Sequence, residues 1–124
     1  MSSILLVDDE EAFRTILHKS LEGAGHQVRS VGHGDEASDA YREKASDLVV
    51  IDLVMPERET VETIALLRTI QRKVRIVAMS GSGRATPKDY VKLAKKIGAN
   101  RLLAKPFSPQ DFLGTVEQVL TEVP

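Results

Sequence analysis

Short apolar runs alternate with longer segments of helical spacing along the chain, and this alternation restricts the fold more than any other feature. Residues 4–7 and 48–51 are continuous apolar runs, and residues 74–79 are apolar except for Arg75. All three segments are short and rich in β-branched side chains, which is typical of strands buried on both faces of a parallel sheet. Residues 27–31 and 101–103 are weaker strand candidates. We therefore expect five strands.

Helical spacing of apolar residues marks the segments that follow the strands. It is clear at residues 13–24, 61–67, 90–97 and 112–120, and weaker at residues 34–44. Five strand–helix units predict an α/β protein with a (βα)5 doubly wound sheet, because right-handed crossovers make consecutive strands parallel. The chain is too short for an eight-unit barrel, so we expect an open, five-stranded parallel sheet in a three-layer fold.

Composition excludes several other classes of protein. The 17 lysines and arginines nearly balance the 18 aspartates and glutamates, which argues against a surface built mainly to bind nucleic acid or an anionic membrane. No apolar run approaches the roughly 18 residues of a membrane span. The absence of cysteine excludes a disulfide scaffold and a thiolate nucleophile. We expect one cytoplasmic domain over residues 1–124, with no direct nucleic-acid binding and no membrane insertion.

Polar residues follow the strand candidates at the sheet edge where doubly wound proteins bind ligands. Asp8 and Asp9 follow the first strand, Asp52 the third and Ser80 the fourth, and Lys105 lies just beyond the fifth. Clustered carboxylates repel one another, and oxygen ligands without cysteine or a histidine cluster favour Mg²⁺ over Ca²⁺ or Zn²⁺. Lys105 and Ser80 then suit an anion on that metal, and phosphate is the usual one.

The same residues predict a chemistry. An aspartate beside Mg²⁺ and a lysine can act as a nucleophile and form an aspartyl phosphate. The metal and the Lys105 ammonium would neutralise charge on the transferred phosphoryl group. Taken singly, Asp9 also fits a helix N-cap and Lys105 an ordinary surface residue. The three histidines, His18, His26 and His33, do not cluster, and we expect them at the surface or in loops.

Five motifs occur in a fixed order, at residues 4–10, 52–57, 77–81, 98–99 and 105–107. Their sequences are ILLVDDE, DLVMPE, VAMSG, GA and KPF. Together they resemble the receiver domain of two-component response regulators over essentially the whole chain. The resemblance implies a flavodoxin-like fold with the strand order 2-1-3-4-5.

The resemblance also implies a metal site. Asp9 matches the direct Mg²⁺ ligand of the family, and Asp8 matches its acidic neighbour, which acts through water. Asp52 also matches a metal ligand. The backbone carbonyl of Val54 matches the third ligand from the protein.

A phosphoryl site is implied beside that metal. Asp52 matches the phosphoacceptor, Ser80 the hydroxyl that hydrogen-bonds the phosphoryl group, and Lys105 the cation that pairs with it. The backbone N–H of Gly81 matches a further donor to the phosphoryl oxygens. The Lys105–Pro106 peptide bond is often cis in this family.

The partners of the family follow from the same resemblance. A histidine kinase or a histidine phosphotransfer protein donates the phosphoryl group, and the receiver catalyses only its own phosphorylation and slow dephosphorylation. We therefore expect a signalling domain and not an enzyme. Its phosphorylation would switch binding to a target protein through the fourth helix, fifth strand and fifth helix, or would pass the group onward in a relay.

The sequence departs from the family pattern at several positions. Leu102 stands where the family usually has tyrosine or phenylalanine, three residues before the lysine, and Arg101 adds a charge beside it. Thr60 stands where glycine is usual, and threonine is a good N-cap. The loop after Ser80 is also about three residues longer than in the chemotaxis member.

Two other functions compete with this interpretation. A haloacid-dehalogenase-like Mg²⁺-dependent phosphatase also uses an aspartate nucleophile, but it usually needs a second aspartate two residues later, and that position is Val54. The second is a receiver-like interaction domain that is not phosphorylated. Leu102 favours it, whereas the presence of Asp52 and Lys105 argues against it.

Overall fold

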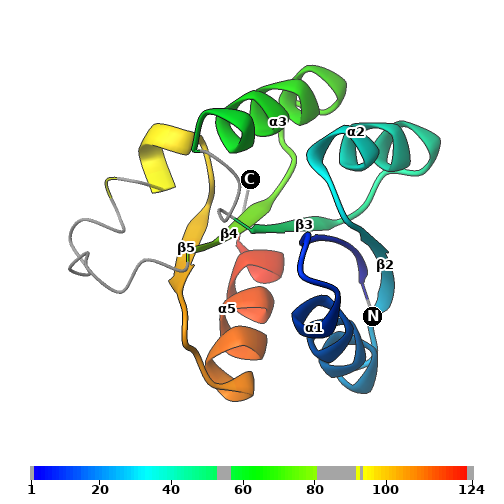
Figure 1. Ribbon diagram of the computed structural model, residues 1–124, viewed down its shortest axis with the longest axis vertical. Helices are drawn as coiled ribbons and strands as arrows, with labels where there is room; N and C mark the ends of the chain where they lie inside the picture. The colour runs from blue at the N-terminus through cyan, green and yellow to red at the C-terminus, as the bar shows by residue number, and fades with distance from the viewer. Residues whose placement is uncertain (1, 53–56, 81–91, 93, 123–124) are drawn as a thin grey trace.

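Five parallel strands form one twisted sheet in the order β2-β1-β3-β4-β5, as Figure 1 shows. The computed structural model describes residues 2–52, 57–80, 92 and 94–122. The predicted α/β class, the five parallel strands and the 2-1-3-4-5 order are confirmed. The strands are β1 (Ser3–Val7), β2 (Gln27–Val31), β3 (Leu48–Asp52), β4 (Ile76–Ser80) and β5 (Arg101–Ala104).

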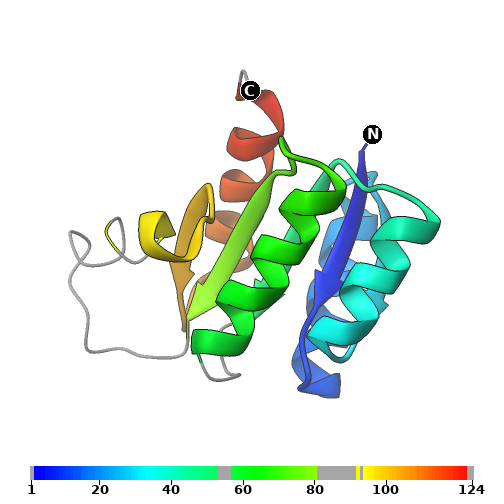
Figure 2. The ribbon, with the colours of Figure 1, turned by 90° about the horizontal axis from the view of Figure 1, so that it is seen from above.

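Helices cover both faces of the sheet and complete the three layers (Figure 1 and Figure 2). One face carries α2 (Gly34–Glu43) and α3 (Glu57–Ile70), and the other carries α1 (Glu11–Gly23) and α5 (Pro109–Thr121). Of the fourth predicted helix, residues 92 and 94–97 are helical, and the rest lies outside the described residues. None of the described helices is long and apolar enough to cross a membrane.

Burial on both faces explains why the central strands β1, β3 and β4 are largely apolar. In β1, Leu5 and Val7 pack beneath α2 and α3, whereas Ile4 and Leu6 pack beneath α1 and α5. The same alternation holds along β3 and β4, where every residue is buried. Successive side chains of a strand point to opposite faces, so a strand between two helical layers needs an apolar residue at each position.

Strand ends differ from the predicted runs by one or two residues. The segment predicted as the fourth strand begins at Val74, but β4 begins at Ile76. Val74 is buried in the core on the α2 and α3 side without belonging to the strand. An apolar side chain indicates that a residue is buried, but a residue belongs to a strand only if its backbone pairs with a neighbouring strand. Val74 meets the first condition and not the second. Asp52 and Ser80, expected after their strands, are their last residues.

His26 lies in a loop, one of the two positions that the sequence predicts for the histidines, but it is buried. Its side chain lies in the loop before β2 and is only 5% exposed. Nδ1 accepts a hydrogen bond from the Ser2 backbone N–H at 3.2 Å, so Nε2 carries the proton and donates to the Glu117 carboxylate at 2.7 Å. Because Glu117 lies on α5, this contact depends on packing between segments far apart in the sequence.

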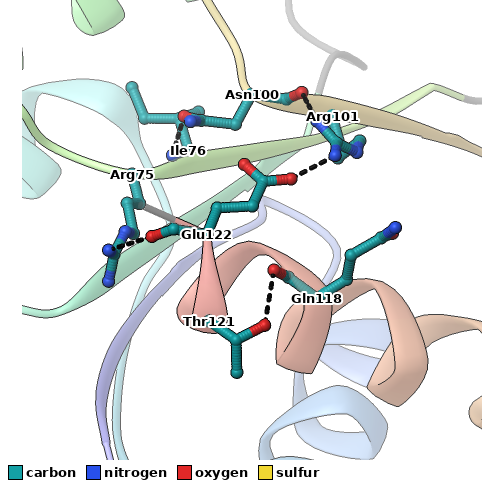
Figure 3. Close-up of polar contacts among 7 residues, drawn as sticks. All are labelled: Arg75, Ile76, Asn100, Arg101, Gln118, Thr121 and Glu122. Atoms are coloured by element: carbon teal, nitrogen blue, oxygen red, sulfur yellow. Dashed lines mark hydrogen bonds and ion pairs between the residues drawn. The ribbon is translucent and has the colours of Figure 1, made fainter. Parts of the chain in front are cut away.

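Both ends of α5 are held by specific hydrogen bonds. Ser108 caps the N-terminus, because its hydroxyl accepts from the Asp111 N–H at 3.0 Å. At the other end, the Arg75 guanidinium donates to the carbonyls of Leu120 (3.1 Å) and Glu122 (2.6 Å). Figure 3 shows the contact of Arg75 with Glu122, whose carboxylate also pairs with Arg101. Arg75 therefore supplies the cation that the last turn of α5 itself lacks.

Replacing Arg75 by alanine is expected to lower the free energy of unfolding by about 1–2 kcal/mol. The substitution removes two charge-assisted hydrogen bonds to helix-terminal carbonyls. Urea unfolding measures the loss. Lys73→Ala is the matched control, since Lys73 is an exposed cation two residues earlier, and its effect should stay within about 0.5 kcal/mol. Equal losses in both variants would contradict the role of Arg75.

Candidate functional site

Three aspartates meet at the edge of the sheet where β1 and β3 end. Asp8, Asp9 and Asp52 each offer a carboxylate oxygen, and these oxygens all lie within 4.8 Å of one another. The sheet register explains the meeting, because Val7 pairs with Ile51, and Asp8 and Asp52 directly follow these two residues. Asp8 and Asp52 are only 1% and 2% exposed, whereas Asp9 faces solvent.

Lys105 places an ammonium group against these carboxylates. Its Nζ lies 3.3 Å from Asp52 Oδ2 and 4.0 Å from Asp8 Oδ2, and the side chain is 16% exposed. The Lys105 backbone N–H donates to the Ser80 carbonyl at 2.7 Å, which continues the pairing of β5 with β4 by one residue. The Lys105–Pro106 peptide bond is cis, as the resemblance implies.

Ser80 lies at the same edge of the sheet. It is the last residue of β4, which lies between β3 and β5. Met79 pairs with Asp52 and Ser80 pairs with Ala104, so Ser80 stands between the acceptor candidate and Lys105 along the edge. It is buried. The structure thus brings the predicted Asp8, Asp9, Asp52, Ser80 and Lys105 to one edge.

Two predicted backbone contacts, the Val54 carbonyl and the Gly81 N–H, lie outside the described residues. The alternative that Asp9 caps a helix is wrong, because the N-cap residue of α1 is Glu10 and its side chain makes no cap hydrogen bond. Leu102, which replaces the usual aromatic residue, is partly buried against the core under α2 and α3.

Burial raises the pKa of the Asp8 carboxyl from 3.8 to about 6. The Glu10 backbone N–H, which donates to Asp8 Oδ1 at 2.9 Å, lowers this pKa, and so does the charge of Lys105. The neighbouring Asp52 carboxylate raises it. Among the described residues, none donates a hydrogen bond to the buried Asp8 Oδ2. The pocket therefore holds more negative charge than the surrounding protein stabilises.

The donor set fits a hard divalent cation. Three carboxylates converge without sulfur or imidazole, which suits Mg²⁺, and a cation would also balance the buried Asp8 oxygen that accepts no hydrogen bond from the described residues. The carboxylate cluster supports the expectation of a metal. The ligands from this chain would be Asp9 and Asp52, with Asp8 nearby.

Substituting Asp8 by asparagine is expected to stabilise the metal-free protein near neutral pH. A carboxyl whose pKa is raised by folding favours the folded state below about pH 4, and this contribution is lost as the pH rises to about 6. Asparagine keeps the oxygen that accepts from Glu10 but carries no charge. Thermal unfolding with a chelator should therefore show a higher Tm for the variant at about pH 7.5 and a smaller difference at about pH 4.

The matched control for this prediction is Asp39→Asn, because Asp39 is an exposed carboxyl on α2. The difference in Tm between Asp39→Asn and the wild type should be the same at the lower and at the higher pH. A gain in Asp8→Asn that is the same at both pH values would contradict a raised pKa for Asp8.

Phe13 is the site residue that the sequence does not reveal. Its ring lies under the Lys105 ammonium, with Nζ 4.2 Å from the ring centroid. The only signal in the sequence is its place in the helical spacing of residues 13–24, which marks it as a core residue. Arg14, the next residue, donates to the Asp8 carbonyl at 2.7 Å.

The fold and the pocket define a flavodoxin-like α/β protein with an acidic site at the carboxyl edge of its sheet. The response regulator receiver domain family matches residues 4–117. The chain therefore belongs to the response regulator receiver domain family, and the predicted resemblance is confirmed.

Individual relatives differ in length and output. The transcriptional regulatory protein GltR of Pseudomonas aeruginosa is 32% identical over 95% of this chain, which spans only 48% of that protein. The chemotaxis protein CheY of Halobacterium salinarum is 31% identical, with 95% of this chain and 96% of CheY covered. Among solved structures, the chemotaxis response regulator CheY4 of Vibrio cholerae has a TM-score of 0.83 and 26% identity, with 96% of this chain and 98% of CheY4 covered.

Proposed function

We propose that Asp52 accepts a phosphoryl group and that the modified protein signals to a partner. The observation that carries this proposal is the buried Asp52 carboxylate at the end of β3, 3.3 Å from the Lys105 ammonium and beside Asp8 and Asp9. Membership of the receiver family supports the same assignment.

The transfer step uses groups that this edge of the sheet supplies. An Asp52 carboxylate oxygen attacks phosphorus and forms an O–P bond. The P–N bond of a phosphohistidine breaks at the same time, and its electron pair leaves with the imidazole, which is protonated from solvent. Lys105 holds a positive charge next to the acceptor and neutralises the transferred oxygens, and Ser80 donates its hydroxyl proton to one of them.

The cofactor of this step would be Mg²⁺. Asp9, Asp52 and the Val54 carbonyl would bind it directly, and Asp8 would act through water. When bound, Mg²⁺ supplies positive charge that offsets the carboxylates and the phosphoryl oxygens. The Gly81 N–H would be a further donor to the phosphoryl group.

The proposed donor is a histidine kinase or a histidine phosphotransfer protein, and the receiver would catalyse only its own modification and its slow reversal. The proposed output is a target protein that docks on the fourth helix, β5 and α5, or onward transfer of the phosphoryl group in a relay. Relatives named as a transcriptional regulator and as a chemotaxis protein support signalling as the general role. A single domain over residues 1–124 and a cytoplasmic location stay predictions.

Neither alternative function is favoured. The phosphatase lacks its second acid, because Val54 stands at that position, and the family match supports a receiver. A receiver that is not phosphorylated would not need an acidic pocket with a lysine held against its carboxylates.

Incubation with acetyl phosphate and Mg²⁺ tests the proposal. The expected product is a protein with one added phosphoryl group that is labile to acid and hydroxylamine, detected by intact mass spectrometry. Chelation of Mg²⁺ should abolish it. Catalytic turnover of a simple phosphate monoester would instead support the phosphatase, and an unmodified protein would support the interaction domain.

A further inference from the structure

All three phenylalanines of the chain form one cluster next to the site. Phe13 comes from α1, Phe107 from the segment after β5, and Phe112 from α5. The rings of Phe13 and Phe107 meet edge to face, with centroids 5.9 Å apart and an interplanar angle of 61°. Phe107 in turn stacks on Phe112 at 5.5 Å and 15°. These are favourable geometries for aromatic pairs, so the rings support one another.

One face of the Phe13 ring carries the Lys105 ammonium, 4.2 Å from the ring centroid. This is well inside the roughly 6 Å limit for a cation–π interaction. The same ammonium is 3.3 Å from Asp52 Oδ2. The Lys105 side chain is largely shielded from solvent, and cation–π attraction is stronger where the cation is desolvated.

The support behind Phe13 makes its ring a fixed surface. Phe112 is fully buried in the core beneath α1 and α5, and it holds Phe107, which holds Phe13. Lysine, by contrast, has a flexible four-carbon stem with many rotamers. A fixed ring beside Lys105 restricts the conformations of its side chain before the reaction. Less conformational entropy is then lost when the ammonium is held at the reacting position.

We propose that Phe13 is a positioning residue for Lys105: its ring face holds the ammonium at the Asp52 carboxylate. The carboxylate attracts the ammonium from one side and the aromatic ring from another, so Lys105 is directed into the pocket before a phosphoryl group arrives. The effect of Phe13 on the phosphorylation rate rests on the proposed function, whereas its effect on the position of Lys105 does not.

Nuclear magnetic resonance tests the positioning directly. Protons above an aromatic ring face shift upfield, so the Lys105 Hε resonances should be upfield of those of an exposed lysine such as Lys73. Phe13→Leu keeps an apolar side chain without a ring face and should abolish the upfield shift. Phe13→Tyr should retain it. Phe107→Leu should reduce it less than Phe13→Leu does, because it removes a ring that supports Phe13 but does not carry the ammonium.

The phosphorylation rate with acetyl phosphate and Mg²⁺ gives the second readout. Phe13→Leu should lower the rate about threefold to tenfold, and Phe13→Tyr should restore most of it. In a Lys105→Met background, Phe13→Leu should have little further effect, because the two residues act as a pair. A purely structural role predicts the same loss in both backgrounds.

The outcomes separate this inference from the proposed function. A wild-type protein that is never phosphorylated overturns the proposed function, while the Lys105 shifts still decide the positioning. Lys105 Hε shifts that are the same in wild type and Phe13→Leu overturn the positioning, whatever the rates. An equal loss of rate for Phe107→Leu and Phe13→Leu also overturns it, because aromatic packing alone would then explain the effect.

Discussion

Asp52→Asn is expected to abolish phosphorylation of the protein by acetyl phosphate. An amide oxygen is a far weaker nucleophile than a carboxylate, and no other carboxyl group described at this edge is paired as closely with Lys105. The fold should persist, because asparagine has the same shape and one charge is removed from an acidic pocket. Intact mass spectrometry after incubation with Mg²⁺ and acetyl phosphate measures the result.

Asp47→Asn is the matched control for this prediction. Asp47 directly precedes β3, whereas Asp52 is its last residue, so the two substitutions remove the same charge at opposite ends of one strand. Asp47 Oδ2 accepts from the Ser3 N–H at 2.8 Å, a bond that an amide oxygen can retain. Asp47→Asn should be modified like the wild type. Undiminished modification of Asp52→Asn would show that the phosphoryl group is attached elsewhere.

The largest loss of stability is expected from Phe112→Ala, about 3–5 kcal/mol in the free energy of unfolding. Phe112 is 0% exposed and belongs to the core that joins α5 to β1, β3 and β4. Its removal leaves a cavity and ends the stacking contact with Phe107. A loss of this size is a large part of the total stability of a domain, about 5–15 kcal/mol. Urea unfolding followed by circular dichroism measures it.

Leu113→Ala provides the comparison, because Leu113 is the next residue of α5 but only partly buried. Its loss should be less than half that of Phe112→Ala. Similar losses at the two positions would mean that Phe112 does not fill a closed space in the core.

The sheet could be predicted from the sequence because two buried faces impose a continuous apolar pattern on each central strand. The meeting of Asp8 and Asp52 followed in turn, since parallel strands end at a common edge and the register places Val7 beside Ile51. These predictions needed only local pattern and sheet geometry. They succeeded because both the apolar pattern of a strand and the alignment of strand ends repeat regularly in a parallel sheet.

Contacts between separate layers could not be predicted in the same way. Phe13 has the spacing of a core residue, and only the packing of α1 against the segment after β5 brings its ring under Lys105. The loop position of His26 was expected but its burial was not, because nothing near it in the sequence indicates that α5 brings Glu117 to it. Side-chain pairs of this kind depend on how helices pack on the sheet, which local periodicity does not encode.

The burial of β1, β3 and β4 on both faces has a consequence for how such a chain can diversify. Every residue of β3 and β4 is buried, so most substitutions there disturb one helical layer or the other. Tolerance to substitution is thereby confined to the outer helix faces and the loops. Sequence drift can then reshape the surface that partners meet while the scaffold that aligns Asp8, Asp52 and Lys105 stays the same.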